Sequence, residues 1–215
     1  MNTNKKLTLD AVIHGVILFS TLFAVGQYFG GKVDVLGSSG TTCFKYFTTD
    51  SNILMALASA VMLFFDIRKL KDPQKNIPRW AEIFRFAGTA AVTLTFVVVV
   101  IFLAPRAMLT QGAQRASGLF TGNVFPLHVS TPLLAILSWI FLDECRDLTF
   151  PESLWALVPV ALYGAVYFWL VIAVKVWVDW YGFTLGGHFE LAPVSILLIL
   201  AVTLGITVLL RKLKK

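Results

Sequence analysis

The chain has 215 residues, of which 57% are hydrophobic and only 14% are charged. Soluble domains are about 45–50% apolar and about 25% charged, so this composition excludes an ordinary soluble domain. The aliphatic and aromatic content excludes intrinsic disorder, and two cysteines are too few for a disulfide scaffold. The composition therefore predicts an integral membrane protein.

Six apolar segments are long enough, or nearly so, to cross a bilayer as helices, which takes about 20 residues each. We expect an all-α, polytopic membrane protein with a single domain over residues 1–215. Its six helices are predicted at residues 9–30, 46–67, 83–105, 125–142, 153–176 and 191–210. The uncharged part of the second segment, residues 51–65, is too short to cross. A full span therefore has to include Asp50, and the alternative is a re-entrant or interfacial segment.

The positive charges predict the orientation of this bundle. With the N-terminus inside, thirteen lysines and arginines lie in the inner segments and five in the outer ones. We therefore expect both termini to be cytoplasmic. Topology and contact with anionic lipids then account for the net charge of +6. Nucleic-acid binding is not expected, because no basic face with interleaved aromatic residues is present.

Polar residues gather at the predicted outer end of the second helix. Thr48, Ser51, Asn52 and Met55 are spaced so that they share one face. Beyond Asn52 the helix is almost wholly apolar, so its polarity is confined to this end. A polar group in hydrocarbon is costly unless it is paired, which makes such a cluster informative.

The fourth predicted helix has a matching feature at its start, where His128 is followed by Thr131 and Pro132. The proline frees a backbone carbonyl near residue 128 and is expected to kink the helix. His128 lies about 21 Å above the inner boundary and Thr48 about 27 Å above it, at 1.5 Å per residue. Ordinary helix tilt absorbs this difference, so both side chains are predicted to lie in one layer just inside the outer leaflet.

A threonine beside a histidine suggests nucleophilic catalysis, because a hydroxyl attacks well only when a base takes its proton. Thr48 is the candidate nucleophile and His128 the candidate base. Asp50 is available to orient the imidazole, although it projects to another side of the helix. The candidates to bind the substrate or stabilise a developing oxyanion are Ser51, Asn52, Asn123 and Thr131. The alternative is interfacial packing without catalysis.

Three further side chains bear on this site. His188 lies in the last outer loop and could approach it, although an ordinary interfacial histidine is the alternative. Trp139 either lines a cavity for lipid or packs in the core. His14, near the inner end of the first helix, is expected to form an interhelical hydrogen bond. The inner-loop acidic residues are expected to be solvated; these are Asp143, Glu144, Asp147 and Glu152.

Neither a cofactor nor a metal is expected. A zinc site of His128, His188 and an acidic residue is conceivable, but no motif of the HExxH type is present. Cys43 falls outside and Cys145 inside in the predicted topology, so they should not pair with each other.

The segment Lys45-Tyr-Phe-Thr-Thr-Asp-Ser-Asn52 and the later segment Leu127-His-Val-Ser-Thr-Pro132 resemble the androgen-induced gene 1 family, which includes the androgen-dependent TFPI-regulating protein. The resemblance covers most of the chain in span count and motif order, and the Ser-Asn pair is similar to the bacterial branch. It implies a multi-pass protein of the bacterial inner (plasma) membrane. It also implies an intramembrane hydrolase of fatty acid esters of hydroxy fatty acids that uses a threonine and a histidine.

The positions that match the catalytic pair of that family are Thr48 and His128, with Thr49 adjacent as an alternative nucleophile. The chain departs from the family in having Ser138 where an acidic residue is common, and Tyr181-Gly182 where Tyr-Pro is common. The leading hypothesis is thus a threonine-dependent hydrolase whose partners are a lipid or fatty acid ester and membrane lipids. A small transporter or lipid-binding protein is the alternative, and a non-catalytic sensor is a third. The oligomeric state is left open.

Overall fold

The computed structural model describes residues 3–34 and 37–214, and within them every regular element is a helix. Six helices overlap the six predicted segments, which confirms the all-α class. They are α1 (Thr3–Phe29), α2 (Phe47–Lys71), α3 (Arg79–Val98), α6 (Thr131–Phe141), α8 (Val158–Phe168) and α9 (Ala192–Leu213).

Shorter elements extend or connect these helices. The π-helical segment η2 (Val99–Leu103) and α4 (Ala104–Gln111) continue α3, and α5 (Ala113–Gly118) follows. The π-helical segment η3 (Pro126–Ser130) leads directly into α6. Around α8, the chain forms α7 (Phe150–Ser153), η4 (Leu154–Leu157) and the π-helical η5 (Trp169–Ala173). Two 3₁₀ turns, η1 (Gly40–Lys45) and η6 (Phe189–Leu191), precede α2 and α9.

Within the described residues, four helical stretches are long and apolar enough to cross a membrane, so the chain is a helical, membrane-embedded protein. They cover Asn4–Phe29, Arg79–Gln111, Phe150–Ala173 and Phe189–Leu213. The stretch Pro126–Phe141 is apolar but shorter, and α2 is not among the four. The two remaining spans of the predicted six therefore stay predictions.

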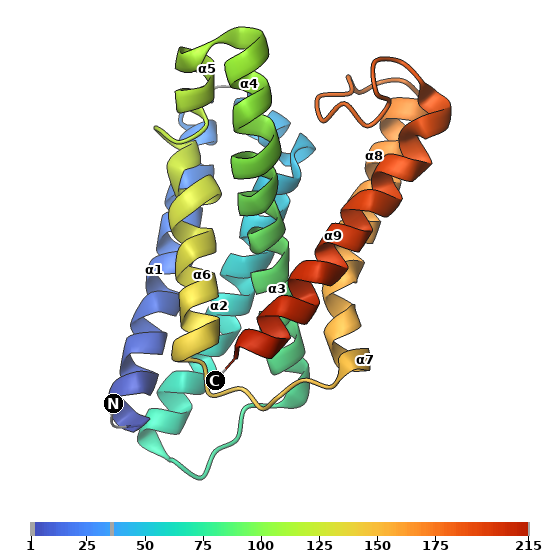
Figure 1. Cartoon of the computed structure of the whole chain (residues 1–215). Helices are drawn as coiled ribbons and strands as arrows, with labels where there is room; N and C mark the ends of the chain where they lie inside the picture. Colours follow the sequence, from blue (N-terminus) through green and yellow to red (C-terminus); the bar gives the residue numbers. More distant parts are fainter. Residues whose placement is uncertain (1–2, 35–36, 215) are drawn as a thin grey trace.

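The start of α1 and the end of α9 lie at the same end of the bundle, which we call the proximal end (Figure 1). The opposite end, at α4 and α5, is the distal end (Figure 1). Thr48 lies in the first turn of α2 and His128 in the segment just before α6, so both lie toward the distal end. Cys43 and Cys145 are free thiols, as expected from their places on opposite sides of the bundle.

Close packing of α2 against α3 forms the centre of the bundle. A Cβ atom at Gly88 of α3 would lie only 3.2 Å from the Met55 Cα atom of α2, so glycine allows this approach. Small residues on α3 continue the contact, because Ala87, Ala90 and Ala91 are all buried.

The pair α8 and α9 meets the rest of the bundle at the proximal end and leans away from α3 toward the distal end (Figure 1). A cavity of about 410 Å³ lies in this wedge, between α3, η2, α8 and α9. The loop between η5 and α9 contributes Tyr181 and Phe183 to its wall.

At the proximal end, the loop after α6 is not simply solvated. Asp143 is 8% exposed and lies 3.4 Å from the buried Arg85 guanidinium, while Glu144 pairs with Lys69 at 2.6 Å. Glu152 pairs with Arg79 at 2.5 Å. The expectation of solvated acidic residues is therefore wrong for Asp143, because a buried arginine requires a counter-ion.

Candidate functional site

Thr48 and His128 line one cavity of about 120 Å³ at the distal end. Thr48 comes from the first turn of α2 and His128 from the π-helical segment before α6. The structure therefore brings together the two side chains that helix lengths alone placed in one layer. Among the described residues, no hydrogen bond joins the Thr48 hydroxyl to the His128 ring.

His128 is held by one ring nitrogen and is only 3% exposed. Its Nδ1 atom lies 2.6 Å from the carbonyl oxygen of Leu119. A carbonyl can only accept, so Nδ1 carries the proton and Nε2 is the basic nitrogen of the neutral ring. The π-helical turn that carries His128 ends just before Pro132, whose missing N–H removes one helical hydrogen bond.

Thr48 lies in the wall between two cavities, because it lines both the His128 cavity and the larger apolar one. Its side chain is half-buried. Thr49, the alternative nucleophile, is only 2% exposed and lines neither cavity. Of the two adjacent threonines, Thr48 is thus the one that a bound molecule can reach.

The larger cavity is suited to a hydrocarbon chain. Its lining is almost entirely aliphatic and aromatic, and its volume falls within the range of ordinary ligand pockets. Several lining residues are also exposed on the outside of the helices: Ile101 is 71% exposed, Leu185 59% and Leu198 63%. An acyl chain could therefore enter sideways from the membrane.

The side chains proposed to stabilise an oxyanion mostly hold helices together. The Asn52 amide nitrogen donates to the carbonyl oxygens of Thr48 and Leu127, both at 2.8 Å, which ties α2 to η3. Ser51 Oγ and Thr95 Oγ1 lie 2.8 Å apart and link α2 to α3. Both amide hydrogens of Asn52 are in use, so it is a positioning residue.

Two other predicted residues also lie at the distal end. Thr131 Oγ1 is 3.4 Å from Ser20 Oγ and connects α6 to α1. The Asn123 side chain is 9% exposed, and its amide nitrogen has no acceptor among the described residues. Neither lines the cavity that holds His128.

Three predicted residues are not brought to the site. Asp50 is half-buried and lines neither cavity, so the Leu119 carbonyl takes the orienting role expected of it. His188 is 66% exposed and lies 3.3 Å from Glu190 in its own loop. Trp139 packs in the core, where its N–H donates to the Leu210 carbonyl oxygen at 3.1 Å. It does not line a lipid cavity.

Three groups of the His128 cavity were not predicted from the sequence. Trp180 Nε1 is a buried N–H without an acceptor among the described residues, and Arg106 and Arg115 add positive charge to the wall. An unpaired N–H beside two cations is a suitable environment for a developing oxyanion. Trp180 belongs to an aromatic cluster in the sequence that is typical of a membrane interface. That interpretation accounted for Trp180 without a role in the cavity.

Asp179 organises the loop that places Trp180 and Tyr181. Its carboxylate accepts hydrogen bonds from Tyr167 Oη at 2.7 Å, from Phe183 N at 2.9 Å, and from Thr184 N and Oγ1 at 2.7 and 2.6 Å. Burial acts to raise the pKa of Asp179, but these hydrogen bonds outweigh it and lower the pKa below its usual value. Tyr181 Oη in turn accepts from Phe47 N at 3.1 Å, which fixes the loop to the start of α2.

No protein-family model, curated protein or solved structure matches the chain.

Proposed function

We propose that this protein is an intramembrane hydrolase of lipid esters, with Thr48 as the nucleophile and His128 as the general base. The observation that carries the proposal is the position of Thr48 in the wall shared by an apolar cavity and the cavity that holds His128. A bound ester would keep its acyl chain in the first cavity and present its carbonyl carbon at Thr48. The motif resemblance points to the same chemistry, with fatty acid esters of hydroxy fatty acids as the substrate class.

In the first half of the proposed reaction, the Thr48 hydroxyl turns toward His128 and attacks the carbonyl carbon of the ester. His128 Nε2 takes the hydroxyl proton as the new C–O bond forms. The carbonyl oxygen becomes an oxyanion, and the Trp180 N–H, which has no acceptor among the described residues, is the candidate donor to it. When the intermediate collapses, the bond to the alcohol oxygen breaks and the protonated imidazole returns the proton to it.

In the second half, water attacks the acyl-threonine while His128 again accepts a proton. Collapse of the second intermediate breaks the bond between the acyl carbon and the Thr48 oxygen, and the imidazolium returns its proton to that oxygen. The fatty acid is released and the Thr48 hydroxyl is restored. The Leu119 carbonyl holds Nδ1 throughout, so the ring keeps Nε2 directed to the reacting atoms.

The proposed setting is a six-span protein of a bacterial plasma membrane with both termini in the cytoplasm. The distal site then lies near the outer leaflet, where the tails of a lipid ester stay in hydrocarbon and its ester group is close to water. The even number of spans agrees with the two chain ends lying at one end of the bundle (Figure 1).

A matched pair of isosteric variants tests the nucleophile. The purified chain in detergent is assayed for hydrolysis of a fatty acid ester and for labelling by a fluorophosphonate probe. We expect Thr48→Val to lose both, while Thr49→Val keeps both, because only Thr48 borders the cavities.

Equal labelling and turnover in wild type and Thr48→Val would refute the assignment of the nucleophile. If the wild type binds a fatty acid ester without turnover, the alternative of a lipid-binding protein is favoured instead. Thermal unfolding of each variant shows that any loss of activity does not come from misfolding.

A further inference from the structure

A second polar cluster is buried near the proximal end, far from the cavities. Asp10 and His14 lie one turn apart on α1, and Asp66 faces them from α2. All three are at most 1% exposed. The expectation that the polarity of α2 is confined to the end that holds Asn52 is therefore wrong, since Asp66 and Ser59 are both buried polar residues of that helix.

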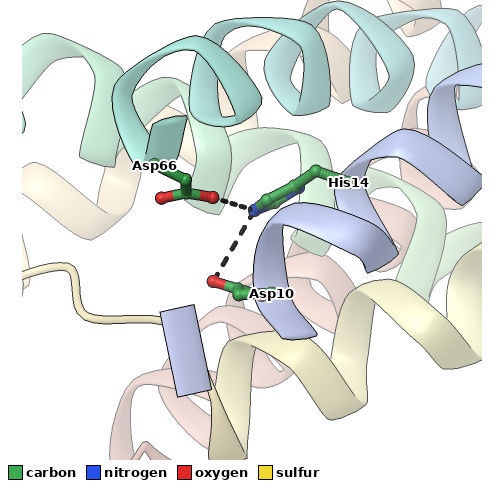
Figure 2. A group of neighbouring side chains, drawn as sticks. All are labelled: Asp10, His14 and Asp66. Atoms are coloured by element: carbon green, nitrogen blue, oxygen red, sulfur yellow. Dashed lines mark ion pairs between the residues drawn. The ribbon is translucent and has the colours of Figure 1, made fainter. Parts of the chain in front are cut away.

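The three side chains converge on one point (Figure 2). His14 Nε2 lies 3.7 Å from Asp10 Oδ2 and 3.8 Å from Asp66 Oδ2. The three atoms all lie within 4.8 Å of one another. These separations are too long for hydrogen bonds, but they suit three ligand atoms around one ion with bonds of about 2.0–2.2 Å.

The histidine is oriented as a metal ligand is. Its Nδ1 atom lies 3.3 Å from Ser59 Oγ, while Nε2 is buried and has no hydrogen-bond partner among the described residues. A ligating histidine ordinarily gives its other ring N–H to such an outer partner, which fixes the ring. Asp10 is held in the same way, because its Oδ1 accepts a hydrogen bond from Ser138.

Asp66 supplies the second independent sign of a ligand. Its Oδ2 atom is buried and has no hydrogen-bond partner within the described part of the chain. It is also the oxygen that faces His14 Nε2. A buried carboxylate oxygen without a donor is costly, and a bound cation would remove that cost.

The neighbouring cations form their direct ion pairs with other carboxylates, and Lys69 pairs with Glu144. Arg85 Nε lies 3.4 Å from Asp143, and Lys214 Nζ lies 3.7 Å from the other oxygen of the same carboxylate. Arg85 also donates to Ser138 Oγ at 2.8 Å and therefore reaches Asp10 only through that hydroxyl. Two carboxylates thus face one imidazole, and a divalent cation would balance their charge.

We propose that Asp10, His14 and Asp66 bind one divalent transition-metal ion, with Zn²⁺ as the best match to a donor set of one imidazole nitrogen and two carboxylate oxygens. The three ligands fill three positions of a tetrahedral zinc ion and leave the fourth for water. Because the ligands come from α1 and α2, the metal fastens these helices at the proximal end. This site is independent of the proposed hydrolase, since Asp66 lies about 27 Å along α2 from Thr48.

Metal content of the full chain tests this proposal directly. The protein is purified in detergent, stripped with a chelator, exposed to Zn²⁺ and freed of excess metal before elemental analysis. We expect one zinc per wild-type chain, a higher Tm than that of the stripped protein, and the visible bands of a tetrahedral site when Co²⁺ replaces Zn²⁺. The variants His14→Gln and Asp66→Asn should lose the zinc.

His188→Gln is the matched control, because that histidine also lies beside a carboxylate but is exposed. It should keep one zinc per chain. Ser59→Ala retains all three ligands and should weaken zinc binding by about 10–100-fold, even if a ligand variant fails to fold. A stripped wild type that takes up no stoichiometric zinc overturns the proposal, as does equal zinc in wild type, His14→Gln and Asp66→Asn.

Discussion

Each end of the bundle holds a buried histidine, and the two differ in what surrounds the second ring nitrogen. At both sites Nδ1 is fixed by an oxygen atom, the Leu119 carbonyl for His128 and the Ser59 hydroxyl for His14. His128 lines a cavity, whereas His14 Nε2 faces two carboxylates. The site of His128 leaves space for a reacting molecule, whereas the side chains around His14 converge on a position that fits a single ion. The same side chain therefore suits a base at the distal end and a ligand at the proximal end.

The largest expected effect is a difference in unfolding free energy between a variant at the proximal end and one at the distal end. Arg85→Met removes a fully buried guanidinium and leaves Asp143 without its closest arginine partner. We expect a loss of about 3–5 kcal/mol in the free energy of unfolding, because an uncompensated buried charge remains. Arg106→Met, in the exposed wall of the distal cavity, should change it by less than about 1 kcal/mol. Equilibrium unfolding in detergent measures both, and equal losses would erase this distinction.

A pair of histidine variants tests whether the two ends have separate roles. His128→Gln should lower ester hydrolysis by at least about 10²-fold, since it removes the proposed base. It should leave zinc content unchanged. His14→Gln should show the reverse, with lost zinc and retained hydrolysis in the folded fraction. Turnover and metal content are measured on the same preparations. Loss of both properties in both variants would show that the two sites depend on each other.

Asp179 provides a smaller test confined to the distal loop. Asp179→Asn weakens the acceptor of four hydrogen bonds, so we expect a loss of about 1–3 kcal/mol in unfolding free energy. Because folding lowers the pKa of Asp179, its ionisation stabilises the fold above the unfolded value of about 3.9. That contribution is lost as the pH falls through the lower folded pKa. Equilibrium unfolding at pH 7 and near pH 3 measures the difference in unfolding free energy between wild type and Asp179→Asn, and this difference should be smaller near pH 3. The control is Asp147→Asn at an exposed site, which should differ little from wild type in unfolding free energy at either pH.

The smallest expected effect concerns which acyl chain the apolar cavity accepts. Gly164 lines this cavity, and a leucine there would occupy part of its volume. Gly164→Leu should shift the preference toward shorter esters, at about 0.8 kcal/mol for each methylene that no longer fits. Gly205→Leu adds the same side chain to α9, where a Cβ has open space, and serves as the control. The measurement is kcat/KM for a series of esters of increasing acyl length. If Gly164→Leu leaves the dependence of kcat/KM on acyl length unchanged, the acyl chain does not bind in this cavity.

Much of the distal site could be predicted from helix periodicity. Thr48 and His128 begin their helices, so counting residues from the opposite ends placed them at similar depth. Two groups at the cavity, the carbonyl that orients His128 and the unpaired indole N–H, come from irregular chain, where no periodicity applies. The Leu119 carbonyl belongs to the stretch after α5, and Trp180 to the loop before α9. Their positions depend on how these loops fold back over the helix ends.

The proximal cluster was missed because its charges resemble boundary charges. The predicted range 9–30 puts Asp10 near the start of the first helix, yet α1 begins at Thr3 and carries Asp10 two turns inside. The predicted range 46–67 puts Asp66 near the end of the second helix, yet α2 continues to Lys71. Arg85 is one of the thirteen lysines and arginines that the topology counts as inner charges, although it is fully buried. A charge count along one segment cannot show that another helix covers it.

The sequence by itself determined that this is an all-α, membrane-embedded chain, because apolar composition and segment length depend on no partner. It also placed a threonine and a histidine in one layer. Only the tertiary structure decided that Thr48 separates two cavities and that Asp50 and His188 line neither of them. It alone brought Asp10, His14 and Asp66 together. The physical reason is that burial and convergence are properties of helix packing, which joins residues more than fifty positions apart.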